Sequence, residues 1–112
     1  MNVNPIIMSA LVSLKLPVFP NAYEGAADEY ITFNYVNEAP SLYADDTDVL
    51  DETTVQVHYF TRGNPQPKKK AIRRLLRASG FTISNTLELY EKDTKFTHVV
   101  VEASIGSIIN DN

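Results

Sequence analysis

The sequence predicts an α+β fold, in which a mixed or antiparallel four-stranded sheet carries helices packed on one face. Two observations support this prediction. Two segments place apolar residues at helical spacing, and four others alternate their residues as strands do. The 112 residues suit one hydrophobic core, so we expect residues 1–112 to form a single domain. The chain has no cysteine, so the domain must fold without disulfides.

The first predicted helix covers residues 4–14, where Ile7, Leu11 and Leu14 recur at helical spacing. A proline at the second residue of this segment suits a first helical turn, and two later prolines prevent the helix from continuing. We therefore expect residues 17–28 to form an extended connector. The apolar part of the helix is too short to span a bilayer and no basic stretch precedes it, so we expect a soluble protein with no membrane partner.

Four strands are predicted at residues 29–37, 53–62, 81–90 and 95–103, where aromatic and β-branched residues are frequent and alternate sides. The last two are joined by a tight polar turn and form a hairpin. Residues 38–52 contain a proline and a cluster of acids, and we expect them to form a long loop. The residues that follow the last strand are expected to fray or to serve in contacts.

The second predicted helix, residues 68–79, is the most distinctive segment, because it is basic in an acidic chain of net charge −4. Its apolar stripe is expected to face the sheet, and Gly80 to end the helix. The stripe consists of Ala71, Ile72, Leu75 and Leu76. The cations on the remaining surface of this helix are Lys69, Lys70, Arg73, Arg74 and Arg77.

Charge is segregated along the chain. One cation and nine acids occupy residues 1–60, whereas nine cations and five acids occupy residues 61–112. The acids that cluster in the predicted loop are Asp45, Asp46, Asp48, Asp51 and Glu52. This segregation is typical of a two-sided surface, which favours head-to-tail association with further copies or with partners of complementary charge. The alternative is that both charged segments are simply solvated faces.

No constellation of residues predicts catalysis, a cofactor or a metal site. His58 and His98 lie on separate predicted strands without the close ligand spacing of zinc sites, although two histidines and a carboxylate would suffice if the strands were neighbours. The acidic cluster lacks the glycine and the terminal glutamate of the common calcium loop. The four glycines do not assemble a phosphate-binding loop. We therefore expect a protein that is not an enzyme and that binds other macromolecules.

Two classes of partner suit the basic helix. Arg73 and Arg77 lie one turn apart, and each guanidinium can hold a phosphate or a carboxylate with two hydrogen bonds. A small nucleic-acid-binding module that uses the basic helix is therefore one hypothesis. A protein partner is favoured, because the net charge is acidic and no basic patch spreads over the whole domain. The tyrosines that are candidate interface anchors are Tyr30, Tyr35, Tyr43 and Tyr59.

The order of the predicted elements, with several short phrases, is similar to that of a known family. An N-terminal helix precedes the phrases Y-I-T-F and V-Q-V-H-Y-F on the first two strands, and an acidic segment lies between them. The helix KKAIRRLLRASGF and a closing hairpin follow. Over residues 3–104, nearly the whole chain, this pattern resembles the tail completion proteins of long-tailed bacteriophages, also called tail terminators or head-to-tail joining proteins.

The resemblance implies a structural virion protein of the phage tail or neck, assembled in the host cytoplasm as a homohexameric ring. Such a ring caps the tail tube protein, docks onto the head-tail connector protein, and lets DNA pass through its lumen without sequence readout. A closed ring needs a heterologous interface, in which different faces of adjacent subunits meet. The alternatives are another neck or tail-tube adaptor and, least favoured, a degenerate enzyme domain.

The charged clusters are the expected contact residues of this ring. We hypothesise that the acidic loop of one subunit lies near the basic helix of its neighbour, or that each cluster addresses a different tail or neck protein. The residues concerned are Lys69, Lys70, Arg73, Arg74 and Arg77 on the helix, and Asp45, Asp46 and Asp48 in the loop.

Overall fold

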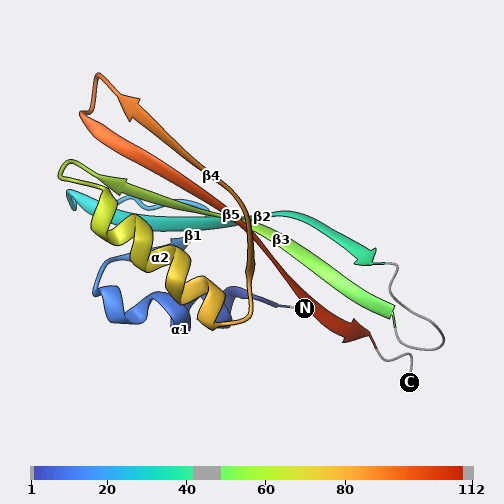
Figure 1. The fold of residues 1–112 in the computed structure, drawn as a ribbon. Helices are drawn as coiled ribbons and strands as arrows, with labels where there is room; N and C mark the ends of the chain where they lie inside the picture. The colour runs from blue at the N-terminus through green and yellow to red at the C-terminus, as the bar shows by residue number, and fades with distance from the viewer. Residues whose placement is uncertain (1, 42–48, 110–112) are drawn as a thin grey trace.

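A mixed sheet of five strands forms the centre of the protein, and two α-helices cover one of its faces (Figure 1). The computed structural model describes residues 2–41 and 49–109. The strands lie in the order β1-β2-β3-β5-β4. The elements are α1 (Asn4–Leu11), the 3₁₀ turn η1 (Val12–Leu14), β1 (Val18–Pro20), β2 (Glu29–Ser41), β3 (Val49–Thr61), α2 (Gln66–Ala78), β4 (Thr82–Glu91) and β5 (Phe96–Ile109). The predicted α+β class is confirmed, with five strands instead of four.

Strand β1 is the one that the sequence prediction misses. It lies parallel to β2, and two backbone hydrogen bonds of 2.8 Å flank it, from Ile31 N to Pro17 O and from Asn21 N to Phe33 O. Three residues are too few to show an alternating pattern, and the prolines around them indicate a connector. Pro20 is tolerated here because β1 is an edge strand, where a missing N–H leaves no partner unsatisfied.

The β2–β3 hairpin is longer than predicted, and the prediction of a loop over residues 38–52 is wrong at both ends. Residues 38–41 pair with residues 50–53 in an antiparallel ladder. Proline and acidic residues disfavour strands when each is considered locally. That preference is overridden because β3 is held between two neighbours along this stretch, β2 on one side and β5 on the other. The rest of the predicted loop, residues 42–48, lies outside the described residues.

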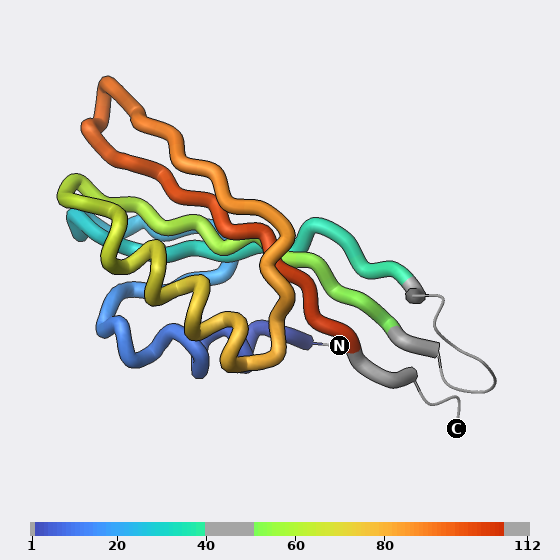
Figure 2. Tube along the Cα trace, viewed as in Figure 1, coloured from blue at the N-terminus to red at the C-terminus, as the bar shows by residue number. Residues whose placement is uncertain are grey.

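Strands β2, β3 and β5 continue beyond the helices as a three-stranded arm, which consists of residues 37–41, 49–54 and 104–109 (Figures 1 and 2). The arm begins at a break in the β2 register between Tyr35 and Asn37, and such bulges bend a strand. The expectation that the chain frays after residue 103 is wrong as far as residue 109, because β5 pairs with β3 over this whole stretch.

The core fills the space between the helices and the sheet. The predicted stripes of both helices face it, with Ile72 and Leu76 of α2 fully buried and Leu75 packed at its edge. Large side chains with no more than 1% exposure come from every layer: Ile7 and Leu11 from α1, Ile72 and Leu76 from α2, and Ile31, Phe33, Val57, Tyr59 and Val101 from the sheet. Within the described ranges, neither helix has the length and apolarity that crossing a membrane requires.

Gly80 ends α2, as the sequence predicts. Its φ of +100° lies in the region that favours glycine, and two backbone bonds of 3.0 Å close the helix end, from Gly80 N to Arg77 O and from Phe81 N to Leu76 O. A Cβ at Gly80 would lie 3.5 Å from Ile105 Cδ1, which is ordinary contact. The backbone conformation, and not a lack of space, therefore requires glycine here.

Candidate interaction surfaces

The first turn of α2 is tied to the sheet by two ion pairs. Lys68 Nζ lies 2.9 Å from both carboxylate oxygens of Glu29 on β2, and Lys69 Nζ lies 3.3 Å from Glu88 Oε1 on β4. Glu29 also accepts a hydrogen bond from the hydroxyl of Tyr59. Burial by itself raises the pKa of Glu29, but the bonds from Tyr59 and Lys68 outweigh it, so the pKa lies below its ordinary value. The helix is thus fixed over the sheet at its N-terminal end.

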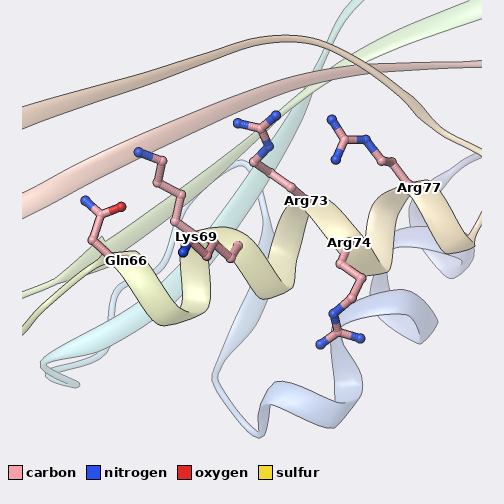
Figure 3. Close-up of a pocket in the computed structure, with 6 residues that line it drawn as sticks. Gln66, Lys69, Arg73, Arg74 and Arg77 are labelled. Atoms are coloured by element: carbon pink, nitrogen blue, oxygen red, sulfur yellow. The ribbon is translucent and has the colours of Figure 1, made fainter.

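The remaining cations of α2 form one continuous surface, which we call the basic stripe: Lys70, Arg73, Arg74 and Arg77. They follow one another at i, i+3, i+4 and i+7, so they share one side of the helix. Among the described side chains, none of them forms an ion pair. With Gln66 and Lys69 they line a surface hollow of about 410 Å³. In Figure 3, Lys69, Arg73 and Arg77 extend toward the β4–β5 side of the helix, whereas Arg74 points toward α1.

Charge is divided between the two layers of the fold more sharply than between the two halves of the sequence. Residues 2–23 and 53–87, which include both helices, contain no acid. We call α1, η1 and α2 the helix layer; it is purely cationic. The described acids lie on the sheet, in its connections and on the arm, where Glu38 and Glu52 are exposed. The two-sided surface expected from the sequence is therefore a positively charged helix layer and a remainder of the described domain in which negative charges predominate.

The predicted acidic partner of the basic stripe is only partly described. Asp45, Asp46 and Asp48 lie outside the described residues, as does Tyr43 among the candidate anchor tyrosines. Asp51 and Glu52 lie on β3 in the arm, in a strand and not in a loop. Figure 1 shows the arm projecting away from α2, so one chain does not bring these two acids to its own basic stripe.

The other face of the sheet is covered by neither α1 nor α2. It carries a row of rings that we call the aromatic row: Phe19, Tyr23, Tyr30, Phe60, His98 and His58. Tyr30 and Phe60 stack with ring centroids 4.7 Å apart, and Phe60 and His98 stack at 4.2 Å. Phe96 meets Tyr30 and Phe60 edge-on, and the guanidinium of Arg62 lies 4.2 Å from the centre of its ring. The row therefore crosses β1, β2, β3 and β5.

Two histidines of this row share a hydrogen bond. His58 Nδ1 lies 2.8 Å from His98 Nε2, and His58 Nε2 lies 2.7 Å from Asn34 Oδ1. If His58 Nε2–H donates to the Asn34 oxygen, His98 donates to His58 Nδ1, which holds His58 neutral. Burial lowers the pKa of both rings; the charge of His98 lowers that of His58 further, while Glu91 acts in the opposite direction on His98.

The strands of the two histidines are neighbours, and this arrangement is the one in which the sequence allows a metal site. Phe60 lies opposite His98 in the β3–β5 ladder, and Val100 lies opposite His58. In the part of the chain that the structure describes, no group of three or more histidine or carboxylate ligands gathers around them. The arrangement supports a polar contact between the two rings.

No protein-family model matches this chain, and no curated protein sequence matches it. Solved structures do. A chain from the virion of a native gene transfer agent particle matches with a TM-score of 0.59 and 10% identity, over 89% of this chain and 84% of that one. The chain shares its fold with a component of that virion. A second match, to the structure of the sheath/tube terminator of an extracellular contractile injection system, has a TM-score of 0.42 and 8% identity over 97% of this chain and 56% of that one.

The aromatic row is the feature that reasoning from sequence overlooked. The strand at residues 53–62 carries core residues such as Tyr59 on one side and His58 and Phe60 on the other, so both of its faces carry large side chains. A strand with one face in water alternates apolar with polar residues. The large side chains of His58, Phe60 and Tyr30 therefore indicate that the second face of the sheet is not simply exposed to water. Phe19 and Tyr23 gave no such signal, because they lie in the segment predicted as a connector.

Proposed function

We propose that this protein is a structural component of a phage-like virion that caps the tail tube as an oligomeric ring and joins the tail to the head connector. The observation that carries the proposal is the fold, which matches a component of a gene transfer agent virion over 89% of the chain. The resemblance of residues 3–104 to tail completion proteins supports the same class. The ring, of six subunits, contacts the tail tube protein on one rim and the head-tail connector protein on the other, and DNA passes through its lumen.

The charge distribution supports a closed ring. Head-to-tail association needs two different and complementary surfaces on each subunit. The helix layer provides a cationic surface, and the sheet with its arm provides an acidic one. In the ring, the basic stripe of one subunit faces acids of the next subunit or of a neighbouring tail protein, with Asp45, Asp46 and Asp48 among the candidates. This arrangement is non-catalytic, because its surfaces serve only to hold proteins together.

The mass of the purified protein tests the ring. Light scattering across a range of concentrations is expected to show several subunits, and electron microscopy to show closed rings. The double variant Arg73→Glu, Arg74→Glu is expected to lower the assembled fraction by about tenfold or more, because it places like charges against each other. Its thermal unfolding is expected to stay unchanged, since neither arginine forms an ion pair within the described chain.

A matched control is Lys92→Glu, Lys95→Glu, which changes the charge by the same amount on the exposed turn between β4 and β5. This control is expected to assemble like the wild type. Normal assembly of the Arg73→Glu, Arg74→Glu variant would show that the basic stripe is a solvated face. It would contradict the proposed contact of the stripe. The mass of the wild-type assembly would then be the test of whether a ring forms.

Duplex DNA binding is the second candidate function. The cations of the basic stripe favour it, because none of them forms an ion pair with another described residue. An electrophoretic shift of labelled duplex DNA at several salt concentrations tests it, because phosphate contacts give a steep salt dependence. A protein that stays a single subunit at every concentration, yet binds DNA tightly through the stripe, would overturn the proposed ring.

A further inference from the structure

The uncovered face of the sheet is more apolar than a face exposed to water needs to be. Antiparallel sheets with one solvated face normally place polar residues there. Here Leu87 and Leu89 on β4, 50% and 54% exposed, continue the aromatic row on the far side of β5, and Phe19 at its other end is 44% exposed. Contiguous exposed apolar surface of this kind marks an interaction site.

The orientation of the rings indicates which kind of partner covers this face. Tyr30, Phe60 and His98 lie within 17° of parallel, with centroids 4.2 to 4.7 Å apart, so the rings stack face to face across adjacent strands. The faces of these rings are therefore occupied by one another. Single-stranded nucleic acids bind by stacking bases on free aromatic faces. Because the faces of these rings are already occupied, the apolar surface of the row favours a protein partner, whose side chains can pack on it.

The helix layer of the same chain has the complementary properties. Met8 and Val12 form an apolar pair one turn apart on the outer side of α1 and η1, 41% and 69% exposed, and α1 contains no charged residue. Beside it runs the cationic basic stripe of α2. Among the described residues, the acids on the uncovered sheet face are Glu91 and Glu102 beside the row and Glu52 on the arm, and Arg62 on this face is paired with Asp28 at the edge.

We propose that a second copy of this chain covers the sheet face, with Met8 and Val12 of one copy packed on the aromatic row and on Leu87 and Leu89 of the next. The basic stripe then lies on the side of Glu91 and Glu102. Because the two surfaces belong to opposite layers of each subunit, the contact is heterologous and repeats from copy to copy. The inference rests on the proposed ring and names the two surfaces that build it.

Two double variants test this contact. Met8→Lys, Val12→Lys alters the helix layer, and Leu87→Lys, Leu89→Lys alters the sheet face; all four residues are exposed, so the fold is expected to survive with unchanged thermal unfolding. Each variant alone is expected to lose assembly and to have the mass of one subunit. A 1:1 mixture is expected to form dimers and nothing larger, because one intact helix layer meets one intact sheet face and the other two surfaces carry lysines. Tyr90→Lys is the matched control, since Tyr90 is 65% exposed on β4 but lies opposite Thr97, on the helix side of the sheet.

The outcomes separate this inference from the proposed function. If the wild type and both variants assemble equally, the ring stands and the inferred contact is wrong. If each variant is a single subunit and the mixture also remains so, the intact helix layer does not bind the intact sheet face and the head-to-tail contact is wrong. If the Met8→Lys, Val12→Lys variant alone forms dimers, the sheet face pairs with its own kind, which also contradicts the head-to-tail contact. If the wild type is a single subunit at every concentration, both the ring and the contact are wrong. Loss of assembly in the Tyr90→Lys control would likewise overturn the assignment to these two faces.

Discussion

Replacing Tyr59 with phenylalanine is expected to loosen the attachment of α2 to the sheet. The Tyr59 hydroxyl donates to the carboxylate of Glu29, which also holds the Lys68 ammonium at 2.9 Å. A hydrogen bond to a charged group contributes about 1.5–3 kcal/mol. The side chain of Glu29 is 28% exposed and keeps Lys68, so water and the ammonium replace part of the lost bond. The expected loss in the free energy of unfolding is therefore about 1 kcal/mol, somewhat below that range.

Urea unfolding followed by circular dichroism measures this loss. Because phenylalanine keeps the buried ring, the core packing is preserved and the difference reports the hydroxyl. The matched control is Tyr90→Phe, since Tyr90 is 65% exposed and its hydroxyl has no partner in the described chain. A difference below about 0.3 kcal/mol between wild type and Tyr59→Phe would refute the reasoning, because such values are typical of surface substitutions.

The pH dependence of the same pair of proteins gives a second reading. The pKa of Glu29 lies below its ordinary value of 4.5, so the folded carboxylate stays charged to lower pH than the unfolded one. Its contribution to stability is complete above pH 4.5 and is lost as the pH falls through the folded pKa. The stability difference between wild type and Tyr59→Phe is therefore expected to be largest above pH 4.5 and to shrink below it. A difference that grows on acidification would contradict this sign.

Three further predictions concern the other parts of the fold. Acidification through the ordinary histidine pKa of 6.5 is expected to lower the free energy of unfolding. The reason is that burial holds the pKa values of His58 and His98 below 6.5, so the unfolded chain takes up protons that the folded chain does not. The His58→Asn, His98→Asn variant is expected to reduce the pH dependence of stability measured in urea titrations, and an unchanged pH dependence would contradict this prediction. Gly80→Ala is expected to cost about 1 kcal/mol from its φ of +100° alone, and a neutral or stabilising effect on chemical unfolding would disprove the backbone explanation. Ile72→Ala is expected to cost about 2–5 kcal/mol, since Ile72 is fully buried on the inner side of α2; a calorimetric loss near zero would mean that α2 is not held by this core contact.

The elements with strong local signals were predictable from the sequence. The sequence predicts nearly the whole basic helix, because its apolar residues recur at helical spacing and Gly80 can adopt the positive φ that ends the helix. In the structure the helix begins at Gln66 and ends at Ala78. The alternation of residues 29–37 also places Ile31 and Phe33 on one face of the predicted strand, and both are buried. These signals lie within a few residues of the elements that they specify.

The predictions that failed concern residues whose conformation depends on strands far away in the sequence. Pro40 and Asp51 belong to strands because β2, β3 and β5 pair with one another, and no local property of either residue indicates this. Tyr35 shares the alternation of Ile31 and Phe33 but is 40% exposed, because it lies at the β2 bulge; its hydroxyl accepts a hydrogen bond from Val3 N. The aromatic row becomes visible only when the strand order brings Tyr30, Phe60 and His98 side by side.

Electron microscopy of particles made by the source genome, with and without the gene for this chain, tests the central proposal most directly. If the protein caps the tail and joins it to the head, deletion is expected to leave filled heads and separate tails, and restoring the gene is expected to return complete particles. Complete, joined particles in the deletion strain would contradict the proposed function.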